Sequence, residues 1–176
     1  MELKETTLST EYMYEGNIIN LKREKVILPD SKEAFREIVE HPGGVCVAAI
    51  TDENELLLVR QFRAGVKDVL LEIPAGKLEK GEEPELCGRR ELEEETGFRA
   101  GTFIKAQEIY LSPAYTEEKI YLYVAKDLYK GKVNFDEDEF IEVVAIPIDE
   151  LKRMVAENKI TDAKTIIAVL MAEEYI

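Results

Sequence analysis

The chain of 176 residues is long enough to bury a core, and its 45% hydrophobic content is ordinary for a globular protein. The formal net charge is −14, from 37 acidic and 23 basic residues, which disfavours binding to the phosphate backbones of DNA and RNA. Acidity does not exclude a phosphorylated small molecule, because a bound divalent cation reverses the local field.

Targeting and thiol chemistry are also constrained by the sequence. The first residues contain no basic stretch followed by an apolar one, so we expect no signal peptide. The longest apolar runs, 45–50 and 166–172, are too short to cross a membrane. Cys46 and Cys87 form no CxxC pair, which indicates free thiols in a cytoplasmic protein. One histidine, His41, excludes a histidine-rich zinc site.

The first forty residues alternate apolar and polar side chains, as half-buried strands do. This pattern predicts a small antiparallel sheet with strands in 11–15, 18–26 and 34–39. Three short strands bury little by themselves. We therefore predict that residues 1–41 form an N-terminal β-sheet subdomain that packs on the main domain or on a second subunit. Residues 42–176 are the predicted main domain.

The main domain begins with strongly apolar strands, predicted at 45–50, 56–59 and 70–73. A helix is predicted from Glu82 to Thr96 by the length of this segment and by its content of Glu, Leu and Arg. Pro84 is compatible with the first turn of this helix, and Gly97 favours its end. The remaining predicted elements are strands at 102–110, 119–124 and 141–146, a helix at 149–157 and a final helix from 161. This order indicates a mixed α/β fold, with a mostly antiparallel sheet flanked by helices.

Three glutamates of the predicted helix, Glu91, Glu94 and Glu95, stand at i, i+3 and i+4 and so share one face. Like charges at this spacing repel by roughly 0.2–0.5 kcal/mol per pair on an isolated helix. This repulsion calls for a cation. Oxygen ligands without histidine or cysteine favour Mg²⁺ or Mn²⁺ over zinc. Arg90 lies beside the face and is placed to hold one carboxylate.

The competing interpretation is a solvated helix face, since surface helices are often rich in glutamate. Two features weigh against it. No lysine follows these glutamates at i+4 within the helix, although solvated faces usually interleave one. The preceding loop contains Gly76 and Gly81, which allow the backbone to approach a ligand closely.

The stretch from Gly76 to Phe98 resembles the Nudix box, whose constrained positions are here filled by Gly76, Glu82, Arg90, Glu91, Leu92, Glu94, Glu95, Gly97 and Phe98. The resemblance implies an α/β/α sandwich around a mixed sheet, and hydrolysis of a nucleoside diphosphate linked to another group. It also implies that Glu91, Glu94 and Glu95 bind metal and that the carbonyl of Ala75 adds a ligand. Glu82 and Arg90 then orient the ligating carboxylates.

The flanks of the box resemble the ADP-ribose pyrophosphatase group within this family. The resemblance is carried by residues 72–76, by 59–63, by 35–39 and by Leu111-Ser112-Pro113, although Ala114 replaces the glycine often found next. It implies the following substrate-binding residues: Arg63 at the diphosphate, Pro113 as the group's marker, and Arg36 and Glu37 at the adenosine end of a neighbouring subunit. The acidic run 136–140 resembles the loop that supplies the general base, for which Glu139 is the expected residue.

The resemblance as a whole implies Mg²⁺-dependent hydrolysis of ADP-ribose to AMP and ribose 5-phosphate by a homodimer. Glu139 or Glu95 would accept the proton of the attacking water. Another nucleotide sugar, such as GDP-mannose, or a broad substrate range remains an alternative, because the box does not separate them. A non-catalytic nucleotide-sugar sensor is disfavoured by the intact box and by the absence of a basic DNA-binding segment. A role in decapping or in sanitising nucleoside triphosphates fits the flanking motifs less well.

Overall fold

The computed structural model describes residues 3–132 and 140–176. Its chain divides into two compact units, the first made of Met1–Gly43 with Tyr110–Lys119 and the second of Gly44–Ile109 with Ile120–Ile176. Across the described residues, no helix has the length and apolar character needed to cross a membrane.

The first unit contains an antiparallel sheet in the order β1 (Thr6–Glu15), β2 (Asn20–Ile27) and β3 (Glu33–Glu40). The predicted N-terminal sheet is therefore present. β1 and β3 are longer than their predicted ranges, because their backbone pairing with β2 continues through polar residues, whereas β2 begins two residues later than predicted and ends one residue later. A segment distant in sequence joins this unit: the amide of Val39 donates to the carbonyl of Tyr115 at 2.7 Å, and the amide of Glu117 donates to the carbonyl of Val39 at 3.0 Å.

The second unit contains two sheets. One has the order β7 (Ala75–Lys77), β4 (Gly44–Ala49), β9 (Lys119–Lys130) and β8 (Phe98–Tyr110). The other has the order β10 (Glu142–Pro147), β5 (Glu55–Arg63) and β6 (Asp68–Glu72). β4 runs parallel to β9 and antiparallel to β7, so the larger sheet is mixed. The helices are α1 (Pro84–Thr96), α2 (Ile148–Ala156) and α3 (Ala163–Met171), followed by the 3₁₀ turn η1 (Ala172–Tyr175).

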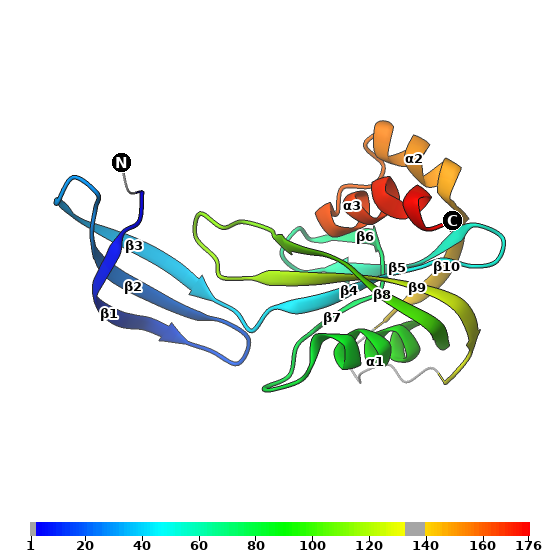
Figure 1. The fold of residues 1–176 in the computed structure, drawn as a ribbon, viewed down its shortest axis with the longest axis horizontal. Helices are drawn as coiled ribbons and strands as arrows, with labels where there is room; N and C mark the ends of the chain where they lie inside the picture. The colour runs from blue at the N-terminus through cyan, green and yellow to red at the C-terminus, as the bar shows by residue number, and fades with distance from the viewer. Residues whose placement is uncertain (1–2, 133–139) are drawn as a thin grey trace. The chain divides into compact units, whose positions relative to one another are not determined.

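Two hydrophobic clusters lie on opposite faces of the mixed sheet, because successive side chains of a strand point to opposite sides. Cys46 and Ala48 of β4 belong to the cluster beneath α2 and α3. Val45 and Val47 belong to the cluster that contains Leu92 of α1. Figure 1 shows α1 on one side of the sheet and α2 with α3 on the other. The predicted α/β/α sandwich with a mixed sheet is confirmed.

The ends of α1 follow from its sequence. The helix begins at Pro84 rather than at the predicted Glu82, because proline fits the first helical position, where its missing N–H costs nothing. It ends at Thr96 and is capped by Gly97, whose φ of 74° is left-handed and whose amide donates to the carbonyl of Glu93. These two ends fix which residues of the box lie on the helix.

Candidate active site

The rotation of α1 is set by close packing against β4. Leu92 and Cys87 are buried in the cluster beneath the helix, with exposures of 1% and 0%. A Cβ on Gly88 would lie 2.8 Å from Cγ1 of Val45, so the helix approaches the strand closely only because this residue is glycine. The expectation that Leu92 anchors the helix in the core is confirmed.

This rotation brings two of the glutamates against the segment that precedes the helix. The Oε2 atom of Glu95 accepts a hydrogen bond of 3.0 Å from the amide of Ala75. The carboxylate of Glu91 lies so close to Gly76 that a Cβ built there would be 1.9 Å from its carboxyl carbon. Glu95 is 2% exposed. Glu91 and Glu95 therefore meet the backbone of residues 75–76 from one side.

Arg90 pairs with three carboxylates of the box, those of Glu82, Glu91 and Glu94. Its Nε donates to Glu82 Oε1 at 3.0 Å. Its Nη1 lies 2.7 Å from Glu91 Oε1 and 2.9 Å from Glu94 Oε2. The hydrogen bond to Glu82 is the main reason that the pKa of Arg90 is raised and that the pKa of Glu82 is lowered. The expectation that Arg90 holds a carboxylate is confirmed, and it extends to three of them.

The donors here suit a hard divalent cation. Among the residues that the structure describes, no three side chains of His, Cys, Asp or Glu form a ready metal cluster. Glu91 and Glu94 nevertheless both direct an oxygen at one nitrogen of Arg90, so a positive charge already lies between them. Carboxylate and carbonyl oxygens are the ligands that Mg²⁺ and Mn²⁺ prefer. The glycine at position 76 leaves the space that the Glu91 carboxylate occupies.

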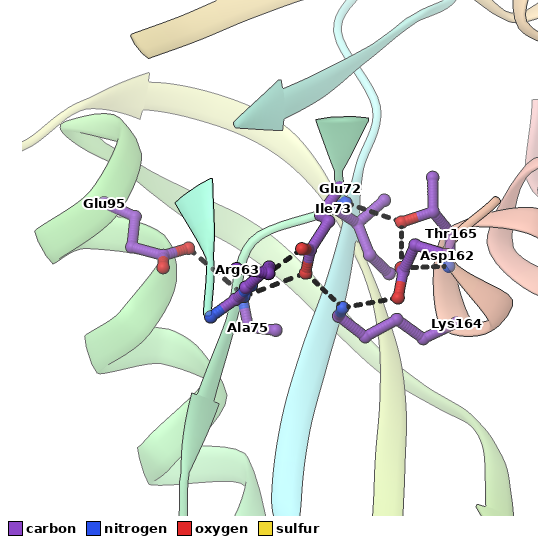
Figure 2. A network of polar contacts seen from close by, with 8 residues as sticks. All are labelled: Arg63, Glu72, Ile73, Ala75, Glu95, Asp162, Lys164 and Thr165. Carbon is purple, nitrogen blue, oxygen red and sulfur yellow. Dashed lines mark hydrogen bonds and ion pairs between the residues drawn. The ribbon is translucent and has the colours of Figure 1, made fainter. Parts of the chain in front are cut away.

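A buried ionic network lies beside this site (Figure 2). Glu72 at the end of β6 is 1% exposed and accepts two hydrogen bonds from Arg63, of 2.7 and 2.8 Å. Nζ of Lys164 also donates to Glu72. Burial raises the pKa of Glu72, but the hydrogen bonds from Arg63 and the charge of Lys164 outweigh this, and the pKa is lowered. Glu72 is therefore a carboxylate held between two cations.

The N-terminus of α3 completes the network. Asp162 caps the helix, accepting from the amide of Thr165 at 3.0 Å and from its hydroxyl at 2.6 Å. The same hydroxyl oxygen accepts the amide of Ile73 at 2.9 Å. The carbonyl of Pro74 accepts from the amide of Val47 at 2.8 Å. Four consecutive residues, 72–75, are thus each held by a named partner, and the last of those partners is Glu95.

The remaining expected substrate residues lie in the first unit. Arg36 and Pro113 line one cavity of about 380 Å³, together with residues such as Thr7, Glu24 and Thr116. Arg36 is paired there with Glu5, its Nε donating at 3.0 Å. Glu37 follows Arg36 on β3 and so points to the opposite face of the sheet, where it stands opposite Arg23. Within one chain, Arg36 and Glu37 therefore lie on opposite faces of this sheet.

Two family models cover this chain almost end to end. The NUDIX domain matches residues 40–169, and the nucleoside diphosphate sugar hydrolase N-terminal domain matches residues 5–39. The chain belongs to the Nudix family. It is therefore a Nudix hydrolase, and the segment from Gly76 to Phe98 is its Nudix box.

Full-length relatives and a solved structure agree with this assignment. The chain is 43% identical over 169 residues to the ADP-ribose pyrophosphatase of Bacillus subtilis, and the alignment covers 95% of this chain and 91% of that protein. It is also 43% identical over 168 residues to the methanol dehydrogenase activator of Bacillus methanolicus, with coverage of 94% and 91%. A crystal structure of an ADP compounds hydrolase superposes with a TM-score of 0.86, at 23% identity and over 98% of this chain and 94% of that one, which supports the fold.

The structure sorts the predicted Nudix residues into three groups. Ala75, Glu91, Glu94 and Glu95 lie together around the start of the box and its helix. Arg63 lies in the Glu72 network of the same unit. Arg36, Glu37 and Pro113 belong to the first unit. Glu139, the expected general base, lies outside the described residues.

Sequence reasoning missed the partners that hold residues 72–75. Asp162 carried a detectable signal, because an aspartate directly before a helical pattern is a common N-cap. Thr165 and Lys164 carried none, since a threonine and a lysine in the first turn of a helix usually face solvent. Thr165 is 0% exposed and the side chain of Lys164 is 11% exposed, because α3 packs with its first turn against the end of β6.

Proposed function

We propose that this Nudix hydrolase cleaves the pyrophosphate bond of ADP-ribose, giving AMP and ribose 5-phosphate, in a Mg²⁺-dependent reaction. The observation that carries the proposal is the meeting of Glu91 and Glu95 with the backbone of Ala75 and Gly76. The two carboxylates lie against the same short backbone segment, which supports their proposed role as oxygen ligands of one metal site. The choice of ADP-ribose is supported by the B. subtilis relative, which is named for that activity.

The residues divide the work as follows in this proposal. Glu91, Glu94, Glu95 and the carbonyl of Ala75 hold Mg²⁺, with Mn²⁺ as a substitute. The bound ion neutralises charge on the diphosphate and lowers the pKa of a water. Glu139 or Glu95 accepts the proton of the attacking water. A carboxylate suits this role because it accepts a proton without leaving a buried positive charge.

Substrate contacts complete the proposal. Arg63 contacts the diphosphate; its side chain is 38% exposed at the end of β5, and its bidentate pairing with Glu72 fixes the direction of the guanidinium. Arg36, Glu37 and Pro113 serve the adenosine end. Because Arg36 and Glu37 face opposite sides of β3, we assign them to different contacts rather than to one pocket.

The assembly we propose is a homodimer formed through the first unit. All ten residues of β1 are exposed, and β1 is an edge strand of its sheet. Edge strands with large exposed apolar side chains are a recognised template for pairing with another chain. A small-molecule nucleotide sugar is the proposed ligand. The cytoplasm is the proposed compartment, because Cys46 and Cys87 are both buried free thiols.

The test is release of phosphate after coupling to a phosphatase, with purified protein, Mg²⁺ and a substrate panel. The panel contains ADP-ribose, GDP-mannose, UDP-glucose, NADH, diadenosine polyphosphates and deoxynucleoside triphosphates. The expected result is a strong preference for ADP-ribose that EDTA abolishes. Preference for GDP-mannose or another nucleotide sugar would keep the chemistry and replace the substrate. Tight ADP-ribose binding by calorimetry without turnover of any compound would instead establish a sensor.

A further inference from the structure

The N-terminus of α3 makes hydrogen bonds and an ion pair to residues 72–73, which lie just before the Nudix box. The two elements are separated by about half the chain, and no residue of α3 belongs to the box. We infer that Thr165 and Lys164 are positioning residues; this inference rests on the proposed function. They hold residues 72–75 in the conformation in which the Ala75 carbonyl and the Glu95 carboxylate can bind the metal. Figure 2 shows the chain of contacts from α3 across β6 to Glu95 of α1.

Thr165 makes the first link through its hydroxyl. The hydroxyl donates to Oδ2 of Asp162 at 2.6 Å and accepts the amide of Ile73 at 2.9 Å. Because its proton is committed to the carboxylate, the oxygen presents a lone pair to Ile73. Thr165 and Ile73 both have 0% exposure, so water does not replace the hydroxyl as a partner for this amide. Removing the hydroxyl leaves a buried N–H without its acceptor.

Lys164 makes the second link through charge. Its side chain is 11% exposed, and its Nζ donates to Asp162 Oδ1 at 2.9 Å and to Glu72. Asp162 thus organises both neighbours: one oxygen orients Lys164 toward Glu72, and the other orients Thr165 toward Ile73. Glu72 is shared with Arg63, which the proposed function places at the diphosphate. The cap of α3 is therefore linked both to Ala75, a proposed metal ligand, and to Arg63, the proposed contact of the diphosphate.

Few freely rotating backbone dihedral angles separate Ile73, which Thr165 holds, from Ala75, which contacts Glu95. Pro74 has a fixed φ, and its carbonyl is held by Val47 at 2.8 Å. The next amide, that of Ala75, donates to Glu95 at 3.0 Å. Planar peptides and a fixed proline leave little freedom between the residue that Thr165 holds and the one that Glu95 accepts from. A shift at Ile73 therefore moves Ala75, whose carbonyl is the proposed ligand.

The experiment compares Thr165→Val, which keeps the shape and removes the hydroxyl, with Thr165→Ser, which keeps the hydroxyl. Thr51→Val is the matched control, because the Thr51 hydroxyl also accepts a backbone amide, that of Glu55 at 3.2 Å, but in a turn outside the network. Three quantities are measured: Mn²⁺ affinity by calorimetry, hydrogen exchange of the amides of Ile73 and Ala75 without metal, and the Mg²⁺ dependence of kcat.

Thr165→Val is expected to weaken Mn²⁺ binding by about tenfold, the lower range for outer-shell partners of metal ligands. Exchange at Ile73 and Ala75 should accelerate in the metal-free protein, and kcat should fall at fixed Mg²⁺ with little change in KM. Thr165→Ser and Thr51→Val should match the wild type in all three. Lys164→Met, which retains the aliphatic stem, carries the same expectation if Thr165→Val fails to fold.

The inference is overturned if Thr165→Val lowers thermal stability while Mn²⁺ affinity and the Mg²⁺ dependence stay at wild-type values, because Thr165 would then be structural only. Failure of the proposed function looks different. A wild-type protein that binds Mn²⁺ but hydrolyses no member of the panel would remove the proposed substrate and leave the positioning role testable by affinity and exchange. A wild-type protein that binds no Mn²⁺ would overturn both the metal site and the inference.

Discussion

At the residue scale, Glu95 is where packing and the proposed chemistry meet. Its carboxylate is buried, yet it accepts a backbone amide rather than lying against apolar groups alone. Such a bond fixes its direction, as a ligating carboxylate requires. Arg90 does the same for Glu82, Glu91 and Glu94. The repulsion expected among the box glutamates is therefore relieved in part by an arginine of the box itself.

Glu95→Gln should lower kcat by about 10²-fold or more while the fold is retained, because glutamine keeps the size but neither binds a cation as an anion nor accepts a proton. Glu93→Gln is the control on the same helix, since Glu93 pairs with Arg99 at 2.7 Å outside the proposed site. Steady-state kinetics and circular dichroism are the measurements. Normal turnover by the Glu95 variant would remove Glu95 from the catalytic assignment.

Gly76→Ala should impair activity through Glu91, because the new Cβ would lie 1.9 Å from that carboxylate and force it to move. Gly65→Ala provides a matched change in the same unit, since a Cβ at Gly65 meets nothing within 4 Å. Activity and Mn²⁺ affinity should both fall for the first variant and stay near wild type for the second. Equal behaviour of the two would mean that the position of Glu91 is not needed.

At the element scale, the buried Glu72 joins three elements: Arg63 from β5, Glu72 from β6 and Lys164 from α3. A buried carboxylate between two cations is stable only while each charge keeps its partner. The network therefore holds α3 against the sheet edge as well as directing residues 72–75. Neither strand nor helix would show this role from its own pattern.

Glu72→Gln should destabilise the protein at neutral pH by about 1.5–3 kcal/mol, the usual value of hydrogen bonds to charged groups, because Lys164 keeps Asp162 and the Arg63 side chain is 38% exposed. The pKa of Glu72 is lowered from 4.5 in the folded protein, so its contribution is complete above pH 4.5 and is lost as the pH falls through the lowered value. Urea unfolding across pH 3–7 tests this: the wild-type advantage over the variant should shrink on acidification. The exposed Glu53, changed to glutamine, controls for loss of one negative charge. A pH-independent difference would contradict the assignment.

At the scale of the whole molecule, the first unit has little interior of its own. Leu8, Tyr12, Met13 and Tyr14 of β1 are each about half exposed. A three-stranded sheet with such side chains in water is marginal by itself. A second copy of the chain is the partner that we propose for it.

Sedimentation should therefore give a mass about twice the 20.1 kDa of the chain. The double change Leu8→Glu and Met13→Glu should shift the protein toward monomer, because charged side chains on an edge strand oppose pairing. Leu170→Glu, at a position 63% exposed on α3, should leave the dimer intact. A wild-type protein that sediments as a monomer at all concentrations would refute the proposed assembly.

Much of this protein was determined by local sequence. Alternation of apolar and polar residues predicted the N-terminal sheet, because burial on one face imposes a repeat of two on a strand. Continuous apolar runs predicted the buried strands, and composition with Pro84 and Gly97 predicted the helix of the box. The box predicted Glu91, Glu94 and Glu95 as metal ligands and Arg90 as their partner, because the spacing of residues on a helix fixes which side chains share a face. Element ends were less exact, since pairing in β9 and β5 continues through residues that no apolar pattern marks.

Only the tertiary structure decided which distant residues meet. Thr165 and Lys164 were brought to Glu72 and Ile73 across a sequence separation of 92 residues, which no local pattern reports. Arg36 and Pro113 came to line one cavity because a segment from beyond the box pairs with the end of β3. Periodicity is a property of one element and its solvent. Hydrogen bonds and ion pairs between elements depend on how those elements pack, and packing is settled by the whole core at once.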